Sequence, residues 1–151
     1  MIGQIKEVGS EERFKIASHQ AFVNVITAMS YSKGGVSALA LALVNQKLAC
    51  KEFLLEHDLK FCLKNAVEEV EKLDPLTCLT QNASFVNKKY TLCCFANSVH
   101  LAFLITGIDS EKTLLIQQLM KAWSIDYESY RMILETIKLM DGQDFKIALG
   151  I

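Results

Sequence analysis

The feature that most constrains this chain is an uncharged stretch over residues 90–108. These nineteen residues contain no Lys, Arg, Asp or Glu and run directly into the acidic segment 109–111. Such a run is typical either of a membrane span or of a helix buried in a protein core. Asn97, Ser98 and His100 lie near its middle, and each would need a hydrogen-bond partner in lipid. We therefore predict the central buried helix of an all-helical domain, with a transmembrane helix as the alternative.

Apolar residues elsewhere in the chain recur at steps of three and four, which is the spacing of one helix face. The first helix is predicted to begin at the Ser10 N-cap and to end at residues 32–33, where Gly34 and Gly35 break it. Residues 1–9 are expected to be loosely ordered. Further helices are predicted over residues 36–44 and 52–56, from the Asp58 cap to residue 73, and after the caps at Asp109 and Asp126. Residues 76–87 are interpreted as a turn of helix and a loop, and residues 145–151 as an apolar tail that folds back onto the domain.

The length and composition of the chain favour a single helical domain. It has 151 residues, of which 51% are hydrophobic, with one proline and seven glycines. A chain of this length buries roughly two-thirds of the surface that its unfolded form exposes. No stretch alternates between apolar and polar residues over a full strand. We therefore predict one all-α domain over residues 1–151, a compact bundle of about six to eight helices with two pseudo-duplicated halves.

Charge and cysteine content narrow the class of protein further. Sixteen basic and seventeen acidic residues give no electrostatic reason to expect nucleic acid as a partner. The five cysteines show no Cys-x-x-Cys spacing, and the N-terminus does not have the pattern of a signal peptide. We therefore expect a cytoplasmic protein whose cysteines serve as small buried hydrophobic residues in a reducing compartment.

Two segments of the chain follow the same pattern. Each has an apolar helix end, over residues 25–29 and 99–103, that runs through glycine into a helix with a serine or acidic cap. The first continues as Ser32-Lys33-Gly34-Gly35-Val36-Ser37-Ala38-Leu39-Ala40, and the second as Thr106-Gly107-Ile108-Asp109-Ser110-Glu111-Lys112. This layout resembles the TerB-like (tellurite resistance protein B) family. Members of that family are all-helical, with two helix–turn–helix halves that carry the signature D-G-x-[IV]-[DS]-x-x-E.

The resemblance also points to a metal site, but the acidic positions of the signature are mostly replaced. In the family, the first aspartate and the last glutamate form acidic surfaces proposed to bind divalent metal. In the first copy Lys33 and Ala40 stand at these positions, and in the second only Asp109 and Glu111 remain as candidate oxygen ligands. Two carboxylates at a helix start also have a simpler role as cap and dipole partner, and calcium takes six to eight oxygens. We expect metal binding to be weak or lost, and no other cofactor.

For function, the resemblance implies a non-enzymatic binding module in a stress-response complex of the tellurite- or phage-resistance type. Such complexes form with protein partners or further copies of the chain, and can assemble peripherally at the inner membrane face. The alternative is an all-α interaction protein of an unrelated family.

The helix from Val36 to Val44 carries this alternative, because its sequence VSALALALV has few polar positions for a surface helix. Burial in the core is the default expectation. Otherwise Leu39, Leu41 and Leu43 are candidates for a face through which the chain dimerises or binds a partner helix.

Residues with catalytic potential are scattered along the sequence. It contains no phosphate-binding glycine loop and no nucleophile elbow, so neither enzymatic activity nor a small-molecule substrate is expected. His100 is predicted to be a core histidine that bonds a neighbouring carbonyl, since its spacing from Cys94 does not suit a zinc site. An enzyme that uses Cys93 or Cys94 as nucleophile would require the fold to bring a histidine to the thiol.

Overall fold

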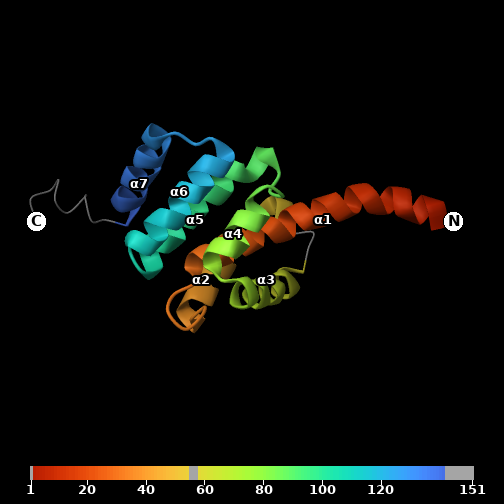
Figure 1. The fold of residues 1–151 in the computed structure, drawn as a ribbon, viewed down its shortest axis with the longest axis horizontal. Helices are drawn as coiled ribbons and strands as arrows, with labels where there is room; N and C mark the ends of the chain where they lie inside the picture. The colour runs from red at the N-terminus through yellow and green to blue at the C-terminus, as the bar shows by residue number, and fades with distance from the viewer. Residues whose placement is uncertain (1, 55–57, 142–151) are drawn as a thin grey trace, which may run out of the picture.

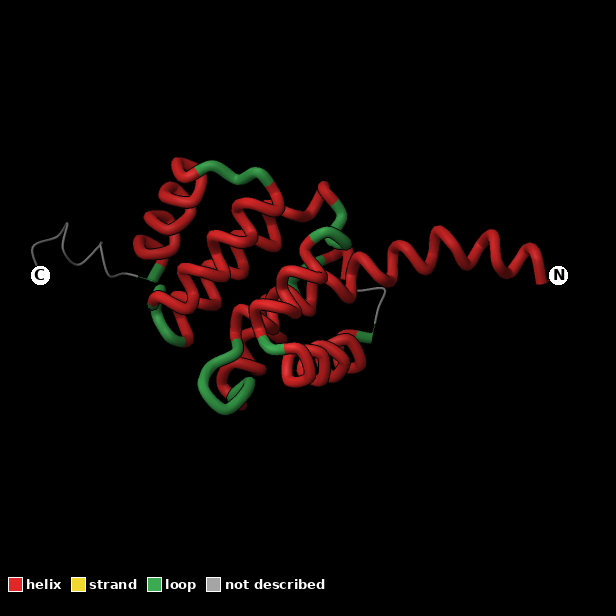
Figure 2. The backbone as a smooth tube through the Cα atoms, viewed as in Figure 1, coloured by secondary structure: helices red, strands yellow, loops and turns green. Residues whose placement is uncertain are grey.

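Seven α-helices and two short 3-10 helices make up the part of the chain that the computed structural model describes, residues 2–54 and 58–141 (Figure 1). They are α1 (Ile2–Ser30), α2 (Ala38–Ala49), η1 (Glu52–Leu54), α3 (Leu59–Leu73), α4 (Pro75–Ala83), η2 (Lys88–Tyr90), α5 (Thr91–Ile105), α6 (Ser110–Trp123) and α7 (Tyr127–Met140). The described residues contain no strand (Figure 2). The prediction of an all-α bundle is confirmed.

The C-terminal half of α1 forms the centre of the core. Every residue from 21 to 30 is buried, and α1 packs against α2, α3, α4 and α5. Polar residues are tolerated there because they bond the helix backbone. Thr27 donates to the Val23 carbonyl and Ser30 to the Thr27 carbonyl, both at 2.7 Å. The uncharged stretch was predicted to hold this central position. Its helix, α5, does carry buried residues, but Leu92 and Leu104 are exposed, so the central helix is α1.

The N-terminal half of α1 extends beyond the other helices (Figure 1). The helix begins at Ile2, so Ser10 lies inside it and does not cap it, and residues 2–9 are helical where loose order was expected. A helix that is already nucleated in the core extends at little cost, and Gly3 and Gly9 each weaken it by only about 1 kcal/mol relative to alanine. Sequence reasoning placed the boundary at Ser10 because a good capping residue is also compatible with a helix interior.

The turn after α1 is built by glycine. Gly34 and Gly35 have φ angles of 92° and 131°, and Ser32 and Gly35 exchange two backbone hydrogen bonds at 3.1 and 2.9 Å. Gly107 has a φ angle of 75° in the turn between α5 and α6. A side chain is strained in this part of conformational space, so both turns depend on glycine. The repeated sequence pattern therefore corresponds to two helix-to-helix turns in which glycine adopts a positive φ angle.

The helix starts predicted from capping residues are confirmed at four positions. Ser37, Asp58, Asp109 and Asp126 each accept a hydrogen bond from the backbone N–H three residues further on, at 3.1, 3.2, 2.8 and 2.7 Å. In α7, Ile137 is buried, whereas Tyr127 and Met140 at the two ends of the helix are exposed. The predicted apolar tail at 145–151 lies outside the described residues.

The helix α4 corrects the prediction of a turn and a loop over residues 76–87. Asp74 ends α3 and also starts α4, since its carboxylate accepts from the Thr77 backbone N–H at 2.9 Å. Pro75 follows at the first helical position, where its missing N–H costs nothing. Asp74 and Pro75, at the end of α3, therefore also begin α4.

A chain of amide side chains joins α1 to α3 and α4. Gln20 Nε2 donates to Asn24 Oδ1 at 2.8 Å and to the Cys62 carbonyl at 2.9 Å. Asn24 Nδ2 in turn donates to Asn82 Oδ1 at 3.0 Å, and Asn82 Nδ2 donates to the Cys78 carbonyl at 2.7 Å. Each bonded amide avoids the penalty of an unsatisfied polar group between packed helices.

Candidate functional site

An apolar groove of about 1050 Å³ lies between α2 and α3. One stripe of α2 forms the first wall, with residues at the spacing i, i+3, i+4 and i+7: Ala38, Leu41, Ala42 and Asn45. The second wall comes from α3, with Phe61, Leu63 and Val67 as its apolar part and Asp58, Lys60, Lys64 and Glu68 around it. Because the alanines of α2 are small, the two helices leave an open hollow between their facing stripes.

The burial of α2 is one-sided. Ala40, Val44 and Leu48 follow each other at steps of four residues and are completely buried. The default expectation of core burial is therefore met by this stripe alone. The stripe that faces away from the core is also apolar, and it forms the groove wall. An exposed apolar surface of this kind is typical of an interaction site.

The three leucines proposed for partner binding lie in different surroundings. Leu41 lines the groove and is 38% exposed. Leu39 is 66% exposed but does not line the groove, and Leu43 is half-buried against the core. Phe61 on the opposite wall is 61% exposed and was missed. The sequence does place Phe61 beside lysines on the polar face of its helix, and this position could have indicated an exposed apolar residue.

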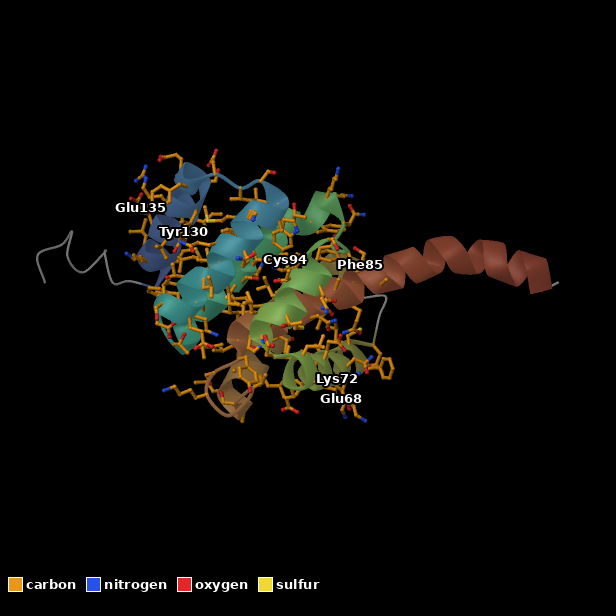
Figure 3. The ribbon with its side chains drawn as sticks, viewed as in Figure 1. Glu68, Lys72, Phe85, Cys94, Tyr130 and Glu135 are labelled. Atoms are coloured by element: carbon orange, nitrogen blue, oxygen red, sulfur yellow. The ribbon has the colours of Figure 1, made fainter. Side chains whose placement is uncertain are left out.

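The rim of the groove carries ordered charges on α3. Lys60, Lys64 and Glu68 are spaced four residues apart and therefore form one ridge, with the lysines towards the N-terminal end of the helix and the glutamate beyond them. Figure 3 shows Glu68 and Lys72 on α3 at the lower edge of the molecule. Exposed charges of this kind contribute about 0–1 kcal/mol each, so they select an orientation more than they supply affinity.

The candidate metal ligands Asp109 and Glu111 lie at the start of α6. Asp109 Oδ1 caps the helix by accepting from the Lys112 backbone N–H at 2.8 Å, and Glu111 is exposed in the first turn. Among the described side chains, those of residue 15 and of residues 17–54 and 58–141, no group of three or more His, Cys, Asp or Glu could hold a metal ion. The geometry therefore assigns Asp109 a capping role.

Lys112 is the structural residue that sequence reasoning missed. Its side chain is 2% exposed, and its ammonium group donates to the Met29 carbonyl at 2.7 Å and to the Tyr31 carbonyl at 2.5 Å. Burial lowers the pKa of Lys112, while Glu111 and Asp109 act in the opposite direction. The lysine thus binds carbonyl groups at the C-terminal end of α1, where a positive charge is favourable. Lys112 lies in the first turn of α6, where its charge opposes the helix dipole, and this unfavourable position could have indicated a structural role.

Burial disfavours the thiolate form of two cysteines, Cys78 and Cys94. Burial raises the pKa of Cys94 well above its usual value, and raises that of Cys78 to about 12. Both groups are therefore protonated thiols at neutral pH, whereas a cysteine nucleophile reacts as the thiolate. Cys94 lies inside the bundle on α5 (Figure 3), with its thiol 3.9 Å from the Phe22 carbonyl oxygen.

His100 was predicted to bond a neighbouring carbonyl, but it lies between two charged side chains. Lys47 Nζ of α2 donates to His100 Nδ1 at 2.5 Å, and we therefore assign the ring proton to Nε2. That nitrogen faces Asp141 Oδ1 at the end of α7, at 3.5 Å, which is an electrostatic contact longer than a good hydrogen bond. Burial lowers the pKa of His100, Lys47 lowers it further, and Asp141 raises it. The ring is neutral at pH 7.

Acidification from pH 7 to pH 5 is expected to lower the free energy of unfolding through His100. Its pKa in the folded protein is below the unfolded value of 6.5, so the unfolded chain binds more protons in the interval between them. The stabilisation is complete above pH 6.5 and is lost as the pH falls through the folded value. Urea denaturation at stepped pH measures it, and His100→Gln should reduce the slope. Equal slopes for both proteins would contradict the assignment.

Comparison with models of known protein families, with curated proteins and with solved structures finds no match. The resemblance to the TerB-like family therefore stays a prediction from the residues of the two glycine turns. Among the helices of the described residues, none combines the length and the apolar character that a membrane span requires.

Proposed function

We propose that this domain is a non-enzymatic protein-binding module that holds an amphipathic helix of a partner protein in the groove between α2 and α3. The observation that carries the proposal is the exposed apolar pair Leu41 and Phe61, one on each wall of a groove of about 1050 Å³. A helix that inserts its apolar face into such a groove is a recurrent mode of peptide recognition.

The charges of the rim specify the chemistry of the partner helix. Acidic residues of the partner would lie beside Lys60 and Lys64, and basic residues beside Glu68. Natural helices favour acidic residues in the first turn and basic residues in the last, because these charges complement the helix dipole. The partner helix is therefore expected to run parallel to α3, with apolar residues at i, i+3 or i+4, and i+7 facing Leu41 and Phe61.

A cytoplasmic stress-response complex, as the TerB-like resemblance implies, would be one setting for this module. Helix binding at the groove needs no metal, because none of its contacts passes through Asp109 or Glu111. Binding of a partner helix is compatible with a degenerate TerB-like domain and with an interaction protein of an unrelated family that binds a partner helix. Dimerisation through Val36–Val44, the other form of that alternative, is a different outcome.

Selection from a displayed library of helical peptides tests the groove without knowledge of the natural partner. Peptides enriched on the wild-type domain are expected to carry acidic residues before, and basic residues after, an i, i+3, i+7 apolar pattern. Leu41→Glu should weaken their binding at least about tenfold in fluorescence anisotropy, because a charge then replaces apolar contact in the groove. Leu92→Glu is the matched control, since Leu92 is exposed on α5 outside the groove.

Two results would overturn the proposal. One is equal binding of the enriched peptides to Leu41→Glu and to a second groove variant, Phe61→Ala, with both proteins folded. The other is a wild-type dimer in sedimentation that Leu41→Glu converts into a stable monomer, because the groove would then be filled by a second copy of this chain and not by a partner helix.

A further inference from the structure

A second hollow, separate from the groove, lies between α5 and α7. It has a volume of about 460 Å³, and its apolar wall on α7 is formed by Met132, Ile133, Ile137 and Met140. Lys47, which reaches in from α2, and His100 of α5 also line it. The two hollows have no lining residue in common. A volume of this size lies within the usual range for small-molecule sites, roughly 300–1000 Å³.

Lys47 brings a positive charge to this apolar hollow. Burial lowers the pKa of Lys47, Lys51 lowers it further, and Asp141 acts in the opposite direction. The ammonium group has three N–H donors, of which one is directed at His100 Nδ1. Among the side chains that the structure describes (residue 15, 17–54 and 58–141), no carboxylate forms an ion pair with Lys47. A partly desolvated ammonium group with unused donors is stabilised when an anion approaches it.

The neighbouring histidine fixes the position of this charge. His100 uses Nδ1 to accept from Lys47 and directs Nε2–H towards Asp141, so the imidazole holds the lysine side chain at the hollow without adding a charge at pH 7. Asn97 and Thr136 also line the hollow and offer neutral hydrogen-bonding groups. The polar groups are therefore few, and one cation lies beside an apolar wall.

We propose that this hollow is a binding site for a small carboxylate that carries an apolar chain. The carboxylate would accept hydrogen bonds from the free donors of Lys47, and the chain would lie along Met132, Ile133 and Met140 on α7. A chain of about ten carbon atoms suits a hollow of this size. Binding of such a ligand is a separate role from helix binding and uses different residues. An experiment that rejects one of the two proposals therefore leaves the other intact.

Titration calorimetry with decanoate tests the site, with decanol as the probe that keeps the chain and removes the charge. We expect decanoate to bind the wild-type protein and Lys47→Gln to weaken it at least about tenfold, because a charge-assisted contact is lost. Lys51→Gln is the matched control: it removes a neighbouring lysine that does not line the hollow, and should change the affinity less than twofold. Decanol should bind more weakly, with the same affinity for wild type and Lys47→Gln.

A second variant is needed because Lys47→Gln also removes the hydrogen bond to His100, and this loss could change the structure of the hollow. Met132 is 59% exposed on the apolar wall, so Met132→Glu leaves the core intact and places a like charge beside the ligand. It should abolish decanoate binding while urea denaturation remains unchanged. Absence of decanoate binding to the wild type at millimolar concentration, unchanged binding by both variants, or equal affinity for decanol would each overturn the proposal.

Discussion

Replacement of Lys112 by methionine is expected to lower the free energy of unfolding by about 3 kcal/mol. The substitution keeps a flexible side chain of similar length but removes both hydrogen bonds to the carbonyls of Met29 and Tyr31. Those carbonyls lie at the end of α1 and lose the cation that complements the helix dipole. The loss of a charged donor to buried acceptors exceeds the gain from burying the methionine, because unsatisfied carbonyls remain.

Urea denaturation followed by circular dichroism measures this effect. Lys121→Met provides the matched control, because Lys121 is exposed on the same helix and its replacement should change stability by no more than about 0.5 kcal/mol. If Lys112→Met unfolds at the same urea concentration as the wild type, the lysine does not hold the end of α1 to the start of α6.

Truncation of Phe95 to alanine is expected to have the largest effect on stability, about 4 kcal/mol. Phe95 is completely buried on α5, and its ring centroid lies 6.1 Å from that of Tyr130 on α7. Figure 3 shows Tyr130 on α7, the last described helix of the bundle. The truncation removes apolar contacts and leaves a cavity that the packed helices fill only in part.

Phe61→Ala is the control of matched chemistry, since it removes the same side chain from an exposed position of α3. Its free energy of unfolding should fall by less than about 1 kcal/mol in the same urea assay. The two variants distinguish a core residue from a groove residue, because only Phe61→Ala should weaken the binding of the enriched peptides while the protein stays folded. Comparable losses of stability in the two variants would contradict either the burial of Phe95 or the exposure of Phe61.

Local interactions explain which parts of the fold could be predicted from the sequence. A capping aspartate and the N–H that it binds are three residues apart, so Asp58, Asp109 and Asp126 could be recognised from their immediate neighbours. The helix α4 was missed because its threonines and its asparagine favour helix only weakly. It is stabilised by the burial of Cys78 and Leu79 against the rest of the core, which periodicity in one short segment does not report.

The candidate sites depend on contacts between distant parts of the chain. An apolar α2 was visible in the sequence, and Leu41, one of the residues predicted to bind a partner, lines the groove. The other wall, with Phe61, required knowledge of which helix lies beside α2. Lys47 and His100 are separated by 53 residues, and Lys112 and Met29 by 83, so spacing within one helix carries no information about either pair.

The covering of α1 also has a consequence for synthesis on the ribosome. The buried segment over residues 21–30 is translated well before α5 and α6, whose contacts with α1 are 72 and 83 residues further along the chain. At about 5–20 residues per second, the ribosome needs roughly 4–16 s to supply these partners. During that interval the buried half of the central helix lacks part of its cover. A chaperone that binds exposed apolar segments would therefore meet this protein at α1, early in its translation.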